Sequence, residues 1–120
     1  MKKFLKPFCY AFSGIFHCFF KQRNFKIQVS FLLLTVALSF WLHISLAEWL
    51  VVIICCVIVL AGEMFNTAIE KLCDFINPSI NPQIKIIKDV AAGAVLLLSV
   101  GAALCGVLIF IPKLYELFIK

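Results

Sequence analysis

Three long apolar stretches, separated by short polar segments, dominate the hydrophobic pattern of the chain. They cover about residues 27–46, 48–75 and 88–111, and a Phe-rich stretch at about 4–20 precedes them. A helix needs roughly 20 apolar residues to cross the hydrocarbon core of a bilayer, and each of the three stretches is long enough. The pattern therefore predicts an all-α membrane protein with three transmembrane helices, and we expect residues 1–120 to form a single domain.

The Phe-rich stretch differs from the other three because polar residues interrupt it. Lys3, Lys6 and His17 lie among the Phe side chains, and Pro7 suits a first helical turn. Aromatic rings can enter the acyl region of a bilayer while Lys side chains stay near anionic headgroups. We therefore expect an amphipathic helix at about residues 4–20 that lies on the membrane surface.

Composition and the placement of charge support a membrane protein. Hydrophobic residues make up 64% of the 120 residues, whereas soluble domains contain roughly 45–50%, so the chain cannot bury this apolar surface in its own core. The net charge of +5 would also suit nucleic acid binding, but six of the eleven Lys and Arg residues lie in the first 26 positions, beside an apolar span. This placement is typical of membrane orientation, and it predicts a cytosolic N-terminus and an external C-terminus.

A stripe of polar residues follows the apolar part of the second span. Glu63, Asn66, Glu70 and Asp74 are separated by three, four and four positions, which places their side chains on one face of a helix. Ionisable groups at membrane depth are costly, and they face a protein interior or a polar cavity. At 1.5 Å per residue, Glu63 lies roughly 22 Å along the helix from Glu48, near the inner edge of the hydrocarbon layer. The stripe therefore lies where a water-soluble reagent can meet a lipid headgroup.

The residues of this stripe suit proton transfer and metal binding. A carboxylate at the boundary can accept a proton from a lipid hydroxyl, and a carboxylate nearer the cytosol can hold Mg²⁺. A second polar pair, Lys88 and Asp89, precedes the third span, and this lysine can neutralise charge on a transferring phosphoryl group. Simpler explanations stay open, since a solvated helix face explains Asp74 and partly Glu70, and the Lys-Asp pair could anchor the span. They do not explain Glu63, which follows twelve mostly apolar residues.

Other candidate residues have simpler explanations. The six cysteines include no C-x-x-C pair, so we interpret them as free thiols that pack as small hydrophobes, in preference to disulfides or a zinc site. His17 and His43 have no second ligand at helical spacing, and we interpret both as interfacial residues. Gly93, Ala94 and Gly101 are expected to allow close packing of the third span against another helix.

Four short motifs carry a resemblance to a known family. The first is E-M-F-N-T-A-I-E-x-x-x-D at residues 63–74, and the second is K-D-V-A-A-G-A-V at residues 88–95. The others are Y-A-F-x-G at residues 10–14 and R-N-F-K at residues 23–26. Together they closely resemble the bacterial integral-membrane diacylglycerol kinase family, which includes the undecaprenol kinases. The similarity extends over almost the whole chain.

The resemblance implies a homotrimer of three-span subunits in the bacterial inner (cytoplasmic) membrane. Such a protein would use ATP and Mg²⁺ to phosphorylate the hydroxyl of a lipid alcohol. By position, Glu63 resembles the catalytic base of the family and Glu70 resembles a metal ligand. The resemblance implies roles in nucleotide binding, phosphate binding or positioning for Tyr10, Gly14, Asn66, Asp74, Lys88 and Asp89.

One residue departs from the family pattern. The position of Gln22 is usually Glu in the family, where its carboxylate helps Glu70 to hold the metal. Gln keeps an oxygen but loses the charge, so we expect either weaker metal binding or another ligand. The R-N-F-K motif resembles the undecaprenol-kinase branch of the family more than the diacylglycerol branch, and this resemblance implies undecaprenol as the lipid. Two competing interpretations are an inactive family member, which Gln22 would explain, and a non-enzymatic oligomeric membrane protein.

Overall fold

The computed structural model describes residues 2–119, and this part of the chain folds into four α-helices. Helix α1 covers Lys2–Lys21, α2 covers Arg23–Trp41, α3 covers Leu46–Ile76 and α4 covers Pro82–Ile119. The last three are long and apolar enough to cross a membrane. The predicted all-α architecture with three helices of membrane-spanning length is therefore confirmed.

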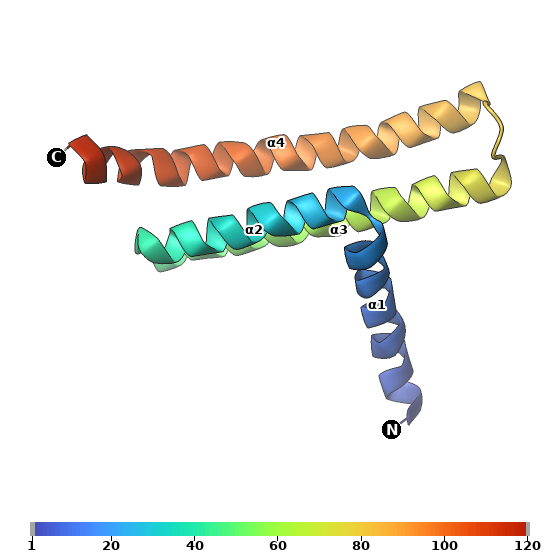
Figure 1. Cartoon of the computed structure of the whole chain (residues 1–120), viewed down its shortest axis with the longest axis horizontal. Coiled ribbons are helices and arrows are strands. Elements are labelled where there is room, and N and C mark those ends of the chain that lie inside the picture. The colour runs from blue at the N-terminus through green and yellow to red at the C-terminus, as the bar shows by residue number, and fades with distance from the viewer. Residues whose placement is uncertain (1, 120) are drawn as a thin grey trace.

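Helix α3 lies at the centre of the arrangement. It packs against both α2 and α4, whereas the backbones of α2 and α4 stay apart and the two helices approach each other through the rings of Trp41 and Phe118, whose centroids are 6.4 Å apart. Figure 1 shows these three helices running lengthwise, with α1 projecting crosswise from the start of α2. At the end where α2 turns into α3, Ile44, Val52 and Phe110 form a small buried apolar cluster. Most other large apolar side chains are exposed, so a bilayer or further copies of the chain must cover them.

The N-terminal end of α4 differs from the sequence prediction. The helix begins at Pro82, six residues before the predicted start of the third span at Lys88. The side chain of Asn81 caps this end, because its Oδ1 accepts a hydrogen bond from the backbone N–H of Gln83 at 2.8 Å. Asn is a favoured N-cap residue, and proline suits the first helical position since the missing N–H is not needed there. The Asn-Pro pair therefore starts α4.

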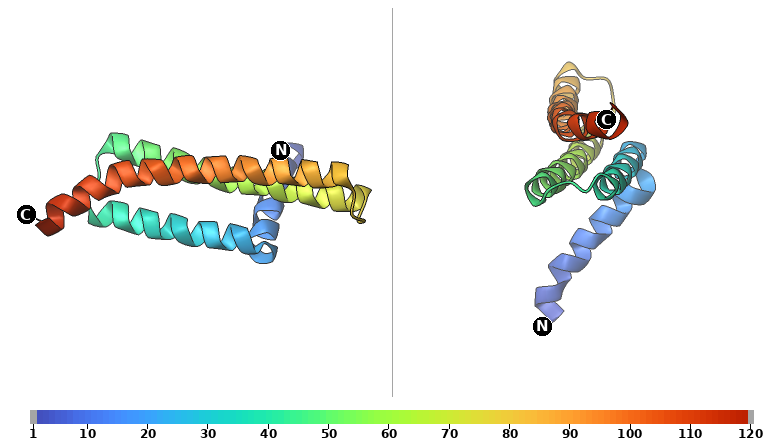
Figure 2. Two further views of the ribbon diagram at one scale, coloured as in Figure 1. Left: turned by 90° about the horizontal axis from the view of Figure 1, so that it is seen from above. Right: turned by 90° about the vertical axis from the view of Figure 1, so that its left-hand side faces the viewer.

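The C-terminal end of α4 also extends beyond the prediction. The helix continues past residue 111, includes Pro112 and ends at Ile119. Proline within a helix removes one backbone hydrogen bond and kinks or breaks the helix, and the C-terminal part of α4 bends (Figure 2). An ion pair of 3.3 Å between Lys113 Nζ and Glu48 Oε2 links this part of α4 to the start of α3.

Short breaks separate the first three helices. Between α1 and α2 only Gln22 is not helical, so α2 starts four residues before the predicted span. Helix α2 ends at Trp41, five residues before the predicted end at position 46. His43 then adopts a left-handed backbone conformation with φ of 53°. Ser45 caps α3, since its Oγ accepts a hydrogen bond from the backbone N–H of Glu48 at 3.2 Å.

The close contact between α3 and α4 involves a glycine of α3. A Cβ atom built on Gly62 would lie 2.4 Å from Cδ1 of Leu98, whereas a Cβ on Gly93 or Gly101 would meet no atom within 4 Å. Within the described chain, the prediction that Gly93 and Gly101 allow close packing is therefore wrong. Helix packing depends on which residue faces the neighbour, and the sequence does not give that register.

A large side chain at Gly62 is expected to destabilise the protein. Gly62→Leu forces Leu98 and the backbone of α4 to move, and overpacking of this kind costs about 1–3 kcal/mol. Gly62→Ala should have a smaller effect, because only the mobile end of Leu98 must shift. Thermal unfolding in detergent, followed by circular dichroism, measures the difference. Gly101→Leu is the matched control, and an equal loss in that variant would contradict the expectation.

Candidate active site

Helix α3 buries one polar face. Glu63, Asn66 and Thr67 are 4%, 7% and 5% exposed, and Glu70 is half-buried one turn further along. The side-chain Nδ2 of Asn66 donates a hydrogen bond to Oε1 of Glu70 at 3.2 Å. Three polar residues of the sequence stripe thus lie on one buried face of an otherwise apolar helix.

A side chain from α2 completes this face. Gln28 Nε2 donates a hydrogen bond to Oε2 of Glu63 at 3.2 Å. The hydroxyl groups of Ser30 and Thr35, also on α2, bond to backbone carbonyls of their own helix instead. The side chain of Asn24 lies near the same carboxylate as Gln28. The Glu63 carboxylate is therefore held between two helices, and the contact that holds it comes from Gln28.

The two residues of the polar pair at the start of α4, Lys88 and Asp89, form ion pairs with different partners. Lys88 Nζ forms an ion pair with Oδ1 of Asp74 and so joins α4 to the end of the stripe on α3. Asp89 pairs with Lys85 on its own helix. Both pairs are substantially exposed to solvent, and pairs of this kind contribute little to stability. The fold thus pairs Lys88 with the stripe, whereas Asp89 pairs with a residue of its own helix.

The predicted residues of the N-terminal region lie apart from this face. Tyr10 is 72% exposed on α1, and a Cβ on Gly14 would meet no atom within 4 Å. Gln22 is the N-cap residue of α2, and its side chain makes no capping hydrogen bond. In the described part of the chain, the C-terminal end of α1 approaches the site, where the buried thiol of Cys18 has a pKa raised by desolvation and by the Glu63 carboxylate.

The described residues, 2–119, do not form a complete metal site. No group of three Cys, His, Asp or Glu side chains in this part of the chain could hold a metal ion together. However, Oδ1 of Asn66 is buried and has no hydrogen-bond partner, and it belongs to the same side chain that contacts Glu70. An amide oxygen and a carboxylate are therefore available as a pair of oxygen ligands.

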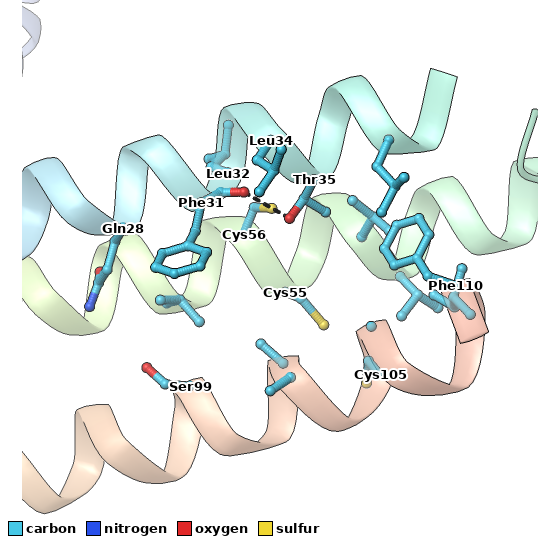
Figure 3. Close-up of a pocket in the computed structure, with 18 of the residues that line it drawn as sticks. Gln28, Phe31, Leu32, Leu34, Thr35, Cys55, Cys56, Ser99, Cys105 and Phe110 are labelled. Atoms are coloured by element: carbon cyan, nitrogen blue, oxygen red, sulfur yellow. Dashed lines mark hydrogen bonds between the residues drawn. The ribbon is translucent and has the colours of Figure 1, made fainter. Parts of the chain in front are cut away.

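An apolar groove lies beside the polar face. It has a volume of about 500 Å³ and is lined by residues of α2, α3 and α4. Figure 3 shows Gln28 at one end, Phe110 at the other, and Cys55 and Cys105 between them. The volume falls within the range of about 300–1,000 Å³ that is usual for small-molecule sites. Because Gln28 both lines the groove and contacts Glu63, the groove leads to the buried carboxylate.

Comparison with known families identifies the chain. The family described as prokaryotic diacylglycerol kinase matches residues 9–110, which is most of the chain. The chain belongs to the prokaryotic diacylglycerol kinase family. The resemblance seen in the sequence motifs is therefore confirmed, and the chain is a phosphotransferase with an alcohol group as acceptor and a multi-pass membrane protein.

The proteins similar to this kinase chain are named either undecaprenol kinase or diacylglycerol kinase. It is 33% identical over 114 residues to an undecaprenol kinase of Bacillus subtilis, covering 95% of this chain and 93% of the relative. It is also 33% identical over 116 residues to a diacylglycerol kinase of Synechocystis, covering 96% of this chain and 66% of the relative. A diacylglycerol kinase of Helicobacter pylori is 28% identical over 96 residues, or 80% of this chain and 75% of the relative. Family membership thus does not decide which lipid alcohol is the substrate.

Sequence reasoning missed one residue of the kinase site. The sequence assigns no role to Gln28, which lies where the polar segment from Lys21 to Gln28 meets the first span, whereas the fold places it in contact with Glu63. A signal was present, because an amide in a membrane-spanning helix needs a hydrogen-bond partner. The sequence does not say which helix supplies that partner.

Proposed function

We propose that this kinase uses ATP and Mg²⁺ to phosphorylate the hydroxyl of a membrane lipid alcohol, undecaprenol or diacylglycerol, at the cytosolic face of the membrane. The observation that carries the proposal is the buried carboxylate of Glu63, which is held by Gln28 at the end of an apolar groove. An apolar alcohol can approach this carboxylate from the groove, and a water-soluble nucleotide can approach it along the polar face. The names of the curated relatives agree with such substrates.

Glu63 is the proposed general base. The oxygen of the lipid hydroxyl forms a bond to the γ-phosphorus of ATP while the bond from that phosphorus to the β,γ-bridging oxygen breaks. The hydroxyl proton passes to the Glu63 carboxylate, and ADP leaves. Glu63 as a residue is 4% exposed, so little water competes for its carboxylate. A positioned base of this kind contributes typically about 10²–10⁴-fold to the rate.

Asn66 and Glu70 are the proposed metal ligands of this chain. The unpaired, buried Oδ1 of Asn66 and the carboxylate of Glu70 fit Mg²⁺, which takes oxygen ligands and usually shares them with phosphates and water. When bound, the ion neutralises charge on the phosphate groups of ATP. Two protein oxygens leave room for phosphate oxygens around such an ion.

Lys88 and Asp74 are proposed to bind the nucleotide phosphates. Their ion pair bridges α3 and α4 one turn beyond Glu70, where a γ-phosphoryl group would need positive charge. Tyr10, Gly14 and Asp89 are proposed to contact the nucleotide in the assembled protein. Because these three residues lie away from the polar face within one subunit, we propose a homotrimer in which neighbouring subunits bring them closer.

The proposed orientation places the N-terminus in the cytosol and the C-terminus outside. Helix α3 has 31 residues and is therefore about 46 Å long at 1.5 Å per residue, which exceeds a hydrocarbon core of about 30 Å. The end that carries Glu70 and Asp74 extends into water on one side. Three spans and the basic N-terminal segment favour the cytosol as that side.

A carboxylate at position 22 is expected to strengthen metal binding. Gln22 is the N-cap residue of α2, the helix that also carries Gln28, and Gln22→Glu would add a carboxylate, an oxygen ligand that Mg²⁺ accepts, at the start of this helix. We expect the Mg²⁺ concentration for half-maximal activity to fall several-fold, and a Mg²⁺ titration at saturating ATP measures it. Gln22→Ala is the control. An unchanged Mg²⁺ requirement in Gln22→Glu would count against a metal site near residue 22.

One assay tests the proposed function and chooses the lipid. Purified protein in mixed micelles is given γ-labelled ATP and Mg²⁺ with either undecaprenol or diacylglycerol, and the lipid phase is counted. We expect label in the lipid, with undecaprenol the better acceptor. Label in neither lipid would support an inactive family member or a non-enzymatic membrane protein, and it would overturn the proposal.

A further inference from the structure

Two cysteines lie opposite each other where α3 packs on α4. Gly62 of α3 lies directly against Leu98 of α4, and the two helices run in opposite directions (Figure 1). Cys55 precedes Gly62 by seven residues, and Cys105 follows Leu98 by seven. Seven residues make about two helical turns, which return a side chain to nearly the same face of its helix. The register of the helix pair therefore places Cys55 opposite Cys105.

The side chains agree with this register. The thiols of Cys55 and Cys105 are within hydrogen-bond reach of each other, and both residues line the apolar groove. Figure 3 shows Cys55 turned toward α4, on which Cys105 lies, whereas the neighbouring Cys56 is turned toward α2. All six cysteines of the chain are free. The structure thus holds the reduced form of a thiol pair that two different helices supply.

The pair lies at membrane depth. Cys55 is seven residues from Glu48 and eight from Glu63, so it is roughly 10–12 Å along the helix from each of them at 1.5 Å per residue. Gln28, Thr35 and Ser99 are the polar side chains of the groove, and its other lining residues are apolar, glycine or cysteine. Water and ions are therefore disfavoured around these two thiols.

These surroundings decide which chemistry the pair can undergo. An apolar site disfavours the thiolate and makes a thiol slow toward reagents in water. In residues 2–119 no third Cys, His, Asp or Glu joins the pair to complete a metal site. A disulfide needs two sulfur atoms and leaves no charge in the hydrocarbon layer. A suitable oxidant would dissolve in the bilayer and would accept protons together with electrons, so that no charge is separated.

We propose that Cys55 and Cys105 form a redox pair that a quinone dissolved in the bilayer oxidises to a disulfide between α3 and α4. Both S–H bonds break and one S–S bond forms. The two electrons and the two protons pass to the quinone, which leaves as the quinol. Every reactant and product is neutral. The disulfide fixes α4 to α3, and the inference does not depend on the proposed function.

The test counts free thiols after oxidation in a membrane. The wild-type protein is placed in phosphatidylglycerol vesicles under argon, treated with decylubiquinone and unfolded in sodium dodecyl sulfate. N-ethylmaleimide then labels the remaining thiols. The reduced chain has six free cysteines, and we expect the intact mass to show two fewer maleimide adducts after oxidation. Peptide mass spectrometry should find Cys55 linked to Cys105, and reduction with dithiothreitol before labelling should restore all the adducts.

Three serine variants identify the partners. Cys55→Ser and Cys105→Ser each have one thiol fewer and should lose no further adduct on oxidation, because the partner is missing. Cys56→Ser is the matched control, since Cys56 also lines the groove but is turned toward α2, and it should still lose two adducts. A wild-type protein that keeps all six adducts, or a Cys55→Ser protein that still loses two, would overturn the inference.

A second oxidant tests the route of access. Tetrathionate is an anion that stays in water, so it should form the link between Cys55 and Cys105 far more slowly than decylubiquinone does. An equal rate for both oxidants would show that the pair is open to water and would overturn the role of the quinone.

The disulfide should also stabilise the packing of α4 on α3. A link between residues 55 and 105 closes a loop of about 50 residues and removes conformational freedom from the unfolded chain. We expect thermal unfolding in detergent, followed by circular dichroism, to shift upward by several degrees in the oxidised wild type and not in oxidised Cys55→Ser. A covalent dimer on a non-reducing gel would instead show that the link joins two subunits, and it would overturn the pairing within one chain.

Discussion

Glu63→Gln is expected to abolish phosphoryl transfer while the protein still folds and assembles. The amide has the same shape as the carboxylate and can still bond to Gln28, but it cannot take the proton of the lipid hydroxyl. Loss of a general base lowers rates by about 10²–10⁴-fold. Initial rates of label transfer from γ-labelled ATP to undecaprenol or diacylglycerol measure the loss. Gel filtration in detergent reports assembly.

A matched control comes from the other end of the same helix. Glu48 is also a carboxylate on α3, but it pairs with Lys113 near the turn between α2 and α3. Glu48→Gln removes the same charge and is expected to keep most of the activity. Near-normal turnover in Glu63→Gln, or an equal loss in both variants, would refute the assignment of Glu63 as the base.

The helical architecture could be predicted from the sequence because membrane-spanning helices are recognised by their length and hydropathy. The predicted ends of these helices were less accurate. The predicted third span stopped at residue 111 and began at Lys88, whereas α4 runs from Pro82 to Ile119. Hydropathy locates the apolar layer, but the helix continues into water on both sides as long as its caps allow. The hydrogen bond that Oδ1 of Asn81 accepts from the backbone N–H of Gln83 sets one of these ends.

Part of the candidate site could also be predicted from the sequence. The spacing of Glu63, Asn66 and Glu70 put them on one face because they share a helix, and that face is buried or half-buried. Contacts between helices could not be predicted in the same way. The hydrogen bond from Gln28 and the close approach at Gly62 depend on the rotation of α2 and α4 against α3. That rotation comes from packing, which helical periodicity does not encode.

Glu70→Ala is expected to weaken the binding of Mg²⁺ to the kinase more than it weakens the binding of lipid. The variant removes the carboxylate that accepts a hydrogen bond from Nδ2 of Asn66, so of the two proposed ligands only the unpaired Oδ1 of Asn66 would remain. The Mg²⁺ concentration for half-maximal activity should rise at least about tenfold, which corresponds to roughly 1.4 kcal/mol of binding free energy. Titrations with Mg²⁺ at saturating ATP and lipid measure it, and Mn²⁺ binding followed by electron paramagnetic resonance measures metal affinity apart from turnover.

The lipid dependence distinguishes a metal ligand from a residue that only supports the fold. Glu70 is half-buried one turn beyond Asn66, on the side of the stripe away from the groove, so its loss should leave the lipid KM within about twofold of wild type. General destabilisation would instead change the Mg²⁺ requirement and the lipid KM together, since it lowers the fraction of folded protein or distorts the whole site. Glu116→Ala, an exposed acid near the end of α4, is the control. A Glu70→Ala protein with an unchanged Mg²⁺ requirement and unchanged Mn²⁺ affinity would show that the metal binds elsewhere, and Asn66 would then need another explanation for its unpaired oxygen.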